Sequence, residues 1–406
     1  MRWFIFITLY CLLTWYSFQA VKTLTKNTYL HFGFLGVVTL VLSYFLYYWL
    51  QPSSGSAFTG NRSLAFGFVL AVLAAEVVIV LFMFGEDILR FLYAGYQKIF
   101  TKSGAEALPS RRNFVSTLAL GIAAIPFASL LYGMWRGKYN FKVLEYELTF
   151  DDLPEAFDGY RITQISDVHS GSFDNHKKIE YAVDLINQQQ SDAIFFTGDL
   201  VNNRADEMKS WKNLFKNLEA KDGVFSILGN HDYGDYVKWN STKEKEENLQ
   251  QLKHTQKEMG WDLLLNEHRI LERNQQKIAI VGVENWGTGG FVKHGDIDKA
   301  GQNLSDKDFK IVLSHDPSYW EERIRDHHKN YQLTLSGHTH GMQFGIEIPG
   351  WFKWSPAQFR YKHWAGIYKE KNRFINVNRG FGFLAYPGRV GMWPEISVLK
   401  LKKSVV

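Results

Sequence analysis

Four long apolar stretches near the start of the chain constrain its fold more than any other sequence feature. They cover residues 3–21, 29–50, 64–84 and 114–135. Each approaches the ~20 apolar residues that a helix needs to cross ~30 Å of hydrocarbon. Because a backbone in lipid must satisfy its own hydrogen bonds, we expect an all-α transmembrane bundle of about four helices over residues 1–136. The first stretch has no clear small-residue cleavage site, so we interpret it as a retained helix.

The basic residues of the short loops bear on the orientation of this bundle. We count seven Lys and Arg on one side and five on the other, which places the loop before the fourth stretch inside. That loop ends in residues 110–115, Ser-Arg-Arg-Asn-Phe-Val, which resemble a twin-arginine export signal or, equally, an anchor with two interfacial arginines. Both features predict that the C-terminal part lies outside the cytoplasm. Glu76 lies within the third stretch, where it is either a functional polar contact inside the bundle or a tolerated contact between helices.

Charge and cysteine content exclude several function classes. The net charge of +5 is small and scattered, so the sequence does not favour a nucleic-acid partner. The single cysteine, Cys11, lies in the first apolar stretch. The chain therefore has no intrachain disulfide, and the C-terminal part has no thiolate ligand and no cysteine nucleophile.

From about residue 140 the pattern changes to short β-type runs that alternate with polar helical stretches. We predict strands over residues 143–150, 160–166, 193–197, 224–228, 277–283, 310–314, 332–336, 374–377 and 395–401. Helices are predicted over residues 175–190, 207–218 and 242–259. Strands that alternate with helices favour a layered α/β architecture, which we place at residues 137–406.

Acidic, imidazole and amide side chains follow directly after five of the predicted strands. The groups are Asp167-x-His169, Gly198-Asp199, Gly229-Asn230-His231-Asp232, Ser314-His315 and Gly337-His338-Thr339-His340. The carboxyl ends of strands in α/β sheets collect ligand sites, so we expect these side chains to meet at one edge. Residues two apart on an extended strand point the same way, which pairs Asp167 with His169 and His338 with His340. The glycines allow the backbone to approach the site closely.

This mixture of ligand types favours divalent metals such as Mn, Fe or Zn. The ligands are too numerous for one ion, whereas two ions that share one bridging carboxylate would account for all of them. Such a pair lowers the pKa of a bound water and neutralises charge on a phosphoryl oxygen. No side-chain nucleophile is then needed.

The ordered series D-x-H, G-D, G-N-H-D, H and G-H-x-H resembles the calcineurin-like metallophosphoesterase family over residues 140–402. The residues around Asp167 and His338 are similar to its membrane-tethered bacterial branch, which includes phosphodiesterases and lipid-precursor pyrophosphatases. The resemblance implies a four-layer sandwich of two mixed β-sheets flanked by helices. It also implies a phosphate-containing substrate and a bacterial inner-membrane location.

The resemblance also implies a role for each matching residue. Asp167, His169 and His340 would hold the first metal, Asn230, His315 and His338 the second, and Asp199 would bridge them. His231 would face the substrate and protonate the leaving group, with Asp232 orienting its ring. The chain departs from the branch at Met342, where a second glycine is common, and this bears on substrate fit rather than metal binding.

Aromatic residues alternate with cations in residues 351–354 and 359–364. They favour contact with a bilayer surface or acyl chain slightly over packing on the domain itself. Arg379 and Arg389 are candidates for phosphate contact or for structural roles. We therefore expect hydrolysis of a phosphomonoester, phosphodiester or pyrophosphate in a lipid-linked or envelope substrate. The alternatives are a cytoplasm-facing pyrophosphatase acting on a nucleotide-diacylglucosamine, and a non-catalytic membrane scaffold or sensor.

Overall fold

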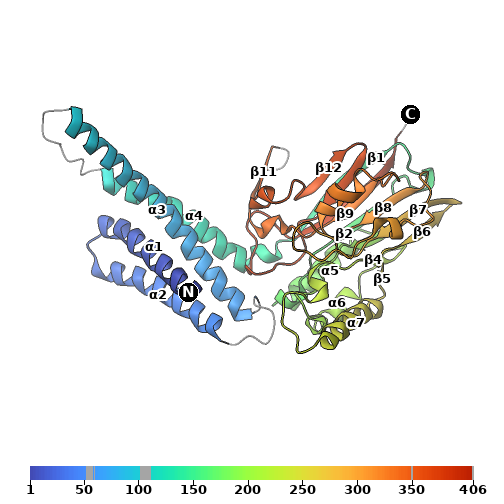
Figure 1. Cartoon of the computed structure of the whole chain (residues 1–406), viewed down its shortest axis with the longest axis horizontal. Helices are drawn as coiled ribbons and strands as arrows, with labels where there is room; N and C mark the ends of the chain where they lie inside the picture. The colour runs from blue at the N-terminus through green and yellow to red at the C-terminus, as the bar shows by residue number, and fades with distance from the viewer. Residues whose placement is uncertain (52–57, 59, 101–110, 349–350, 405–406) are drawn as a thin grey trace. The chain divides into compact units, whose positions relative to one another are not determined.

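The computed structural model describes residues 1–51, 58, 60–100, 111–348 and 351–404 (Figure 1). The chain divides into two compact units. One comprises Met1–Pro52 and Gly60–Trp135, and the other contains Arg136–Val406. The described residues of the first unit form helices and short connections without strands, and the second unit combines helices with strands.

The helical unit contains four helices that are long and apolar enough to cross a membrane. They are α1 (Arg2–Leu24), α2 (Thr28–Leu50), α3 (Gly60–Phe100) and α4 (Arg111–Trp135). These confirm the four predicted spans, but α3 extends well beyond the predicted residues 64–84. The apolar run ends before the charged residues Glu86, Asp87 and Arg90, yet the helix continues past them. An i,i+4 ion pair of 2.5 Å between Glu86 and Arg90 supports the helix in this region. At 1.5 Å per residue, the 41 residues of α3 span about 62 Å, twice the hydrocarbon thickness.

Polar side chains connect the helices of this unit. Glu76 is buried, and its Oε1 accepts a hydrogen bond of 2.8 Å from Thr14 of α1, so it makes a polar contact between two helices. Of the twin-arginine-like segment, residue 110 lies outside the described residues. Arg112 belongs to α4 and forms an ion pair of 2.8 Å with Asp87 of α3. This arginine therefore helps to join two helices.

The second unit is built on two six-stranded mixed sheets. The first sheet has the order β1 (Lys142–Phe150), β14 (Glu395–Lys403), β2 (Arg161–Ile165), β3 (Ala193–Phe196), β4 (Val224–Ser226) and β5 (Asp262–Leu263). The second has the order β12 (Gly366–Glu370), β13 (Arg373–Val377), β9 (Leu333–Ser336), β8 (Phe309–Leu313), β7 (Gln276–Gly282) and β6 (Glu267–Arg273). A separate hairpin pairs β10 (Ile346–Ile348) with β11 (Phe352–Trp354). Strands β2, β3 and β4 are parallel neighbours, as are β7, β8, β9 and β13.

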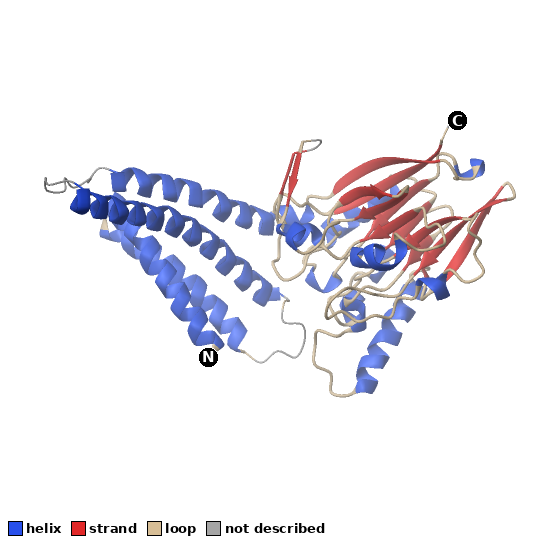
Figure 2. Ribbon diagram, turned by 45° about the horizontal axis from the view of Figure 1, so that its top comes forward, coloured by secondary structure: helices blue, strands red, loops and turns tan. Residues whose placement is uncertain are grey.

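Three hydrophobic cores separate four layers (Figure 2). Helices α5 (His176–Asn187), α6 (Lys212–Phe215) and α7 (Thr242–Glu258) contribute to a core on the outer face of the first sheet. The central core lies between the sheets, where Phe150 of β1 packs edge-on against Phe309 and Phe374 with ring centroids 5.0 Å apart. The third core joins the second sheet to α8 (Ile297–Ala300), α9 (Pro317–Tyr319) and Trp320. These layers confirm the predicted sandwich of two mixed sheets flanked by helices.

The structure differs from the predicted elements in several places, and β5, β10 and β11 are among the strands that were not predicted. The predicted helix over residues 207–218 is broken into a 3₁₀ turn, Ala205–Met208, and the short α6. Strands β6 and β12 were not predicted, because charged residues interrupt the apolar pattern in both. They form the two edges of the second sheet, where charged side chains are expected because they discourage pairing with another chain.

Candidate metal centre

Two groups of possible metal ligands lie among the loops that follow the strands. Asp167, His169 and His340 form the first group, and Asp199, His315 and His338 form the second, with the ligand atoms of each group within 4.8 Å of one another. In the first group, His340 Nε2 lies 3.2 Å from Asp167 Oδ1 and 3.0 Å from His169 Nε2. The loops after β2 and β9 supply this group.

The second group is assembled by the loops after β3, β4, β8 and β9. His315 Nε2 lies 3.1 Å from Asp199 Oδ2, 3.3 Å from His338 Nδ1 and 3.1 Å from Asn230 Oδ1. Asn230 therefore adds an amide oxygen to the carboxylate and two imidazoles. Its Nδ2 donates to the hydroxyl of Tyr236, which directs Oδ1 toward His315.

Asp199 lies between the two groups. Its Oδ2 is 3.1 Å from His315 Nε2 in the second group and 3.6 Å from His169 Nε2 in the first. The side chain is buried, and its Oδ1 accepts the backbone N–H of His231 at 2.8 Å. One carboxylate oxygen thus faces both groups of ligands.

Five of these residues have left-handed backbone conformations. The φ angles are 53° at Asp167, 47° at His169, 61° at Asp199, 72° at His338 and 51° at His340. Such a conformation costs roughly 1–2 kcal/mol for a residue that bears a Cβ, and it occurs most often at functional sites. The extended-strand argument is therefore wrong for His338 and His340. The backbone turns between them, and their side chains enter different groups, although Asp167 and His169 do share one.

Close backbone approaches require glycine at two of the predicted positions. Gly198 has a φ of +98°, and a Cβ there would lie 2.6 Å from the backbone nitrogen of Gly229 and 2.8 Å from His315 Nδ1. A Cβ at Gly337 would collide with Ser166 Oγ and Asp167 Oδ2. The prediction that these glycines bring the backbone close to the site is confirmed.

His231 and Asp232 have partners that the sequence did not predict. His231 Nδ1 lies 2.7 Å from the carbonyl oxygen of Asn202, so Nδ1 carries a proton and donates it. Asp232 instead accepts the backbone N–H groups of Asp199 at 2.9 Å and Gly229 at 2.8 Å. The expectation that Asp232 orients the His231 ring is corrected, because the Asn202 carbonyl occupies that position and the carboxylate turns toward the backbone.

Two further side chains hold His338 and were missed by the sequence analysis. His338 Nε2 lies 2.8 Å from the hydroxyl of Tyr361 and 3.4 Å from Asp316 Oδ2, while Nδ1 faces the metal-ligand group. Partners of this kind fix the tautomer and orientation of a ligating imidazole. The sequence could have indicated Asp316 as a residue of the site, because it directly follows His315. Nothing in the sequence indicated Tyr361, which lies 23 residues from His338.

The electrostatics of the site suit a cation. Burial opposes ionisation of Asp199, but His315 and His231 outweigh it and hold the pKa of Asp199 well below its ordinary value. Burial likewise opposes ionisation of Asp167, yet His340 lowers the pKa of that carboxyl. Burial lowers the pKa of His169 well below its ordinary value. Burial favours the neutral form of His315, but Asp199 outweighs it and raises the pKa of His315 to about 10. Metal ions bind ionised carboxylates and neutral imidazoles, so this donor set fits divalent metals, and binding at His315 would release its proton.

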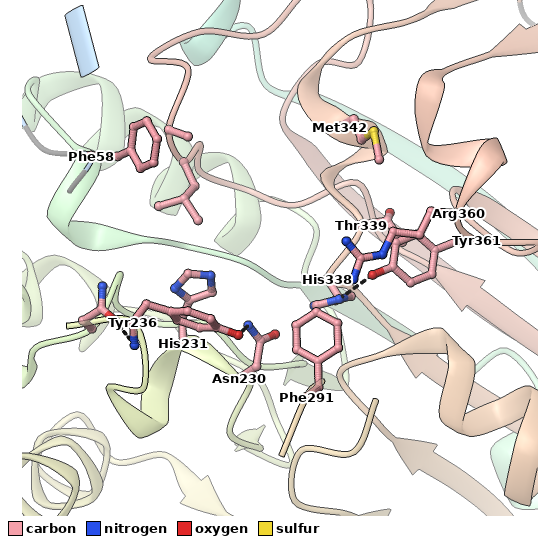
Figure 3. A pocket seen from close by; sticks show the side chains of 13 residues that line it. Phe58, Asn230, His231, Tyr236, Phe291, His338, Thr339, Met342, Arg360 and Tyr361 are labelled. Carbon is pink, nitrogen blue, oxygen red and sulfur yellow. Dashed lines mark hydrogen bonds between the residues drawn. The ribbon is translucent and has the colours of Figure 1, made fainter. Parts of the chain in front are cut away.

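A cavity of about 480 Å³ opens over the site (Figure 3). Asn230, His231 and His338 line it on the side of the metal-ligand groups. Arg360 also lines it, and its guanidinium lies 5.4 Å from the ring centroids of Phe291 and Tyr361. Other lining residues are Asn203, Tyr236, Thr339, Met342, Leu384 and Ala385. The cavity thus offers an arginine cation and an aromatic wall beside the ligands.

Comparison with known proteins accounts for both units. Residues 160–342 match the family model "Calcineurin-like phosphoesterase". Residues 1–138 match "Probable Calcineurin-like phosphoesterase, transmembrane domain". The chain belongs to the calcineurin-like phosphoesterases. It is a membrane protein, and its enzymatic class is that of a hydrolase acting on phosphoester bonds.

Several relatives of this phosphoesterase carry similar descriptions. The chain is 27% identical to "Uncharacterized metallophosphoesterase YkuE" of Bacillus subtilis over 73% of this chain and 98% of the relative. It is 27% identical to an "Uncharacterized metallophosphoesterase" of Helicobacter pylori over 98% of this chain and 97% of the relative. A "Transmembrane protein with metallophosphoesterase domain" of Danio rerio is 26% identical over 75% of this chain and 66% of the relative.

The two candidate arginines near the C-terminus of the phosphoesterase are both buried. Arg379 forms ion pairs of 2.6 Å with Glu395 and 2.7 Å with Glu347. Arg389 donates from Nε to the carbonyl oxygen of Gly382 at 2.7 Å. Their guanidinium groups are committed to partners in the protein, so we assign both arginines structural roles.

Proposed function

We propose that this phosphoesterase hydrolyses a phosphomonoester, phosphodiester or pyrophosphate with a water activated by two divalent metal ions, either Mn, Fe or Zn. The observation that carries the proposal is that Asp199 Oδ2 faces both groups of ligands. In this proposal Asp167, His169 and His340 hold the first ion, Asn230, His315 and His338 hold the second, and Asp199 bridges them. When bound, the two ions would supply a nucleophilic water and neutralise charge on the phosphoryl group.

Other residues of the chain have roles in catalysis, in substrate binding and in positioning the loops of the site. His231 lines the cavity and donates from Nδ1 to Asn202. When the ring is also protonated at Nε2, as an imidazolium, that nitrogen would donate a hydrogen bond to a phosphoryl oxygen and pass its proton to the leaving group. Arg360 provides a further positive charge at the cavity wall, suited to an anionic substrate. Asp232 positions the loops that bear Asp199 and Asn230 through backbone hydrogen bonds.

We propose in addition that the substrate is lipid-linked or belongs to the cell envelope. Between the cavity-lining Met342 and Arg360, the chain exposes large apolar side chains to solvent. These are Ile346, Ile348, Trp351, Phe352 and Phe359, with Trp351 81% and Phe359 80% exposed. Exposed aromatic residues of this kind suit the water–lipid interface. The acyl part of a substrate would lie against them while its phosphate enters the cavity.

Purified full-length protein tests the activity. We expect about two equivalents of transition metal per chain and turnover of bis-p-nitrophenyl phosphate, with both reduced in Asp199→Asn. The matched control is Asp206→Asn, which changes an exposed carboxylate elsewhere in the same unit. Metal binding without turnover over a broad panel of phosphate esters would instead support a scaffold or sensor.

We propose further that the catalytic unit lies on the extracytoplasmic side of a bacterial inner membrane. The support is the excess of Lys and Arg in the loops assigned to the inside, including the loop before α4. A reporter fused after α4 tests this placement, because alkaline phosphatase is active only after export. An inactive fusion would place the site in the cytoplasm and would favour a pyrophosphatase of lipid-precursor synthesis.

A further inference from the structure

The helical unit contains a cavity of its own, which the phosphoesterase activity does not use. It has a volume of about 330 Å³ and lies among α2, α3 and α4. Its lining consists of apolar side chains and small residues, with Glu76 as the single ionisable group among the described residues that line it. Ligand cavities in proteins measure about 300–1,000 Å³, so this one can hold a small molecule.

Glu76 brings an unsatisfied polar atom to this cavity. Its side chain is only 2% exposed, and its Oε1 accepts a hydrogen bond from Thr14 at 2.8 Å. Its Oε2 is buried and has no hydrogen-bond partner in the described part of the chain. A buried acceptor without a donor costs ~1–3 kcal/mol, and more if it is charged. A carboxyl group in a membrane-spanning helix is therefore expected to have a partner or a function.

The other two carboxylates of α3 have cationic partners. Glu86 pairs with Arg90 at 2.5 Å, and Asp87 pairs with Arg112 at 2.8 Å. Glu76 forms no ion pair with any residue that the structure describes, and it faces an apolar cavity instead of an arginine. The missing complement at this position is a positive charge that can donate a hydrogen bond to Oε2.

We propose that this cavity binds a lipophilic primary amine. The alkyl chain would lie against side chains such as Val72, Leu120 and Phe127, and the ammonium group would donate to Glu76 Oε2. In a medium of low dielectric constant, the attraction between an ammonium and a carboxylate is far stronger than in water. An alcohol of the same length can exchange hydrogen bonds with the carboxyl group but cannot form an ion pair with it. The amine is therefore preferred over the alcohol.

Thermal unfolding of the full-length protein in detergent micelles tests the proposal with n-decylamine as the probe and n-decanol as its neutral control. A ligand that binds only the folded state raises the unfolding midpoint, and above its Kd the rise follows the logarithm of the ligand concentration. We expect n-decylamine to raise the midpoint with increasing concentration, and by more than n-decanol at each concentration. In Glu76→Gln, which keeps the side-chain shape, the shift with the amine should fall to that of the alcohol.

A second pair of variants keeps the test decisive if Glu76→Gln folds poorly. Ala124 lines the cavity from an exposed position on α4, so Ala124→Phe fills the space without entering a packed core. It should abolish the shift with n-decylamine. Val77→Phe adds the same ring to α3 at a side chain that is 43% exposed and not part of the lining, and it should leave the shift intact. An equal response of the wild type, Glu76→Gln and Ala124→Phe to the amine would overturn the proposal.

Turnover of bis-p-nitrophenyl phosphate provides an independent readout for the same variants. Glu76 and Ala124 belong to the helical unit, whereas the metal-ligand groups belong to the other unit. We expect all three variants to retain wild-type turnover. A failure of the amine site would therefore be distinguishable from a failure of the proposed phosphoesterase activity.

Discussion

Asp232 Oδ2 accepts the backbone N–H of Asp199 at 2.9 Å, across an interval of 33 residues. The same oxygen accepts the N–H of Gly229 at 2.8 Å, and Oδ1 accepts the N–H of Leu200 at 2.8 Å. One carboxylate therefore ties the loop after β3 to the loop after β4, and these loops supply Asp199 and Asn230. Burial, together with the charge of Asp199, raises the pKa of Asp232 to about 7.

Replacement of Asp232 by asparagine should weaken metal binding. The amide has one acceptor oxygen, so its NH₂ group would face a backbone N–H and displace one of the two loops. We expect metal affinity to fall by about 10–100-fold, the usual effect of losing a residue that orients ligands. Equilibrium titration with metal measures the change. Unchanged affinity with reduced turnover would show that Asp232 acts through His231 after all.

The partners of His338 Nε2 allow a prediction specific to one metal position. In Tyr361→Phe the imidazole loses the hydroxyl that hydrogen-bonds its Nε2, so the affinity of the Asn230–His315–His338 position should fall by about 10–100-fold. The other position should keep its affinity. A two-step metal titration separates them, and Tyr368→Phe serves as a control because that hydroxyl accepts the N–H of Trp364 instead. Equal weakening of both steps would contradict this assignment.

His231→Gln should reduce turnover and leave the metal content unchanged. General acid catalysis contributes about 10²–10⁴-fold, so we expect a loss of this size with an alkyl phosphate ester. The loss should be smaller with a p-nitrophenyl ester, because its leaving group needs little protonation. Comparison of kcat for the two substrates checks the role. An equal loss with both would indicate that His231 stabilises the phosphoryl group without protonating the leaving group.

The lowered pKa of Asp192 predicts that the stability of the fold depends on pH. Burial opposes its ionisation, but the backbone N–H of Arg161, with Lys221 and Arg273, outweighs burial and holds the pKa of Asp192 below its ordinary 3.8. The ionised form therefore stabilises the fold above pH 3.8, and this contribution is lost as the pH falls through the lowered pKa.

The expected measurement compares the unfolding midpoints of wild type and Asp192→Asn from about pH 6 to about pH 3. The wild type should be more stable at the upper end, and the difference should shrink toward the lower end. Asp184→Asn, which changes an exposed carboxylate on α5, is the control. A difference that grows with acidity would have the wrong sign and would exclude this linkage.

Local sequence patterns predicted a layered α/β architecture and the ligand types, whereas the four-layer sandwich was predicted from the family resemblance. Where Gly-Asp or Gly-Asn-His-Asp directly follows a strand, the polar side chains lie at the carboxyl end of that strand. The carboxyl ends of neighbouring parallel strands share one edge of the sheet, so these side chains are expected to meet there. The rule that residues two apart on an extended strand point the same way did not predict that His338 and His340 belong to different groups. It fails here because both residues adopt positive φ angles. Such conformations are set by the surrounding structure rather than by intrinsic preference.

Long-range contacts account for the rest of what the sequence did not predict. The hydroxyl of Tyr361 reaches His338 from a segment beyond the β10–β11 hairpin, and the Asn202 carbonyl reaches His231 across 29 residues. A backbone carbonyl is present at every residue and therefore leaves no mark in the sequence. The roles of Asn202 and Tyr361 became visible only when the loops were placed together.

The position of β14 has a consequence for how the protein is made. This strand, near the end of the chain, lies between β1 and β2, parallel to β1 and antiparallel to β2. During synthesis β1 follows α4 out of the ribosome but has no neighbour until residues 395–403 have also emerged. The first sheet can therefore close only after residues 395–403 have been synthesised. Until then its apolar strand edges are exposed, and a nascent chain at this stage should depend on chaperones.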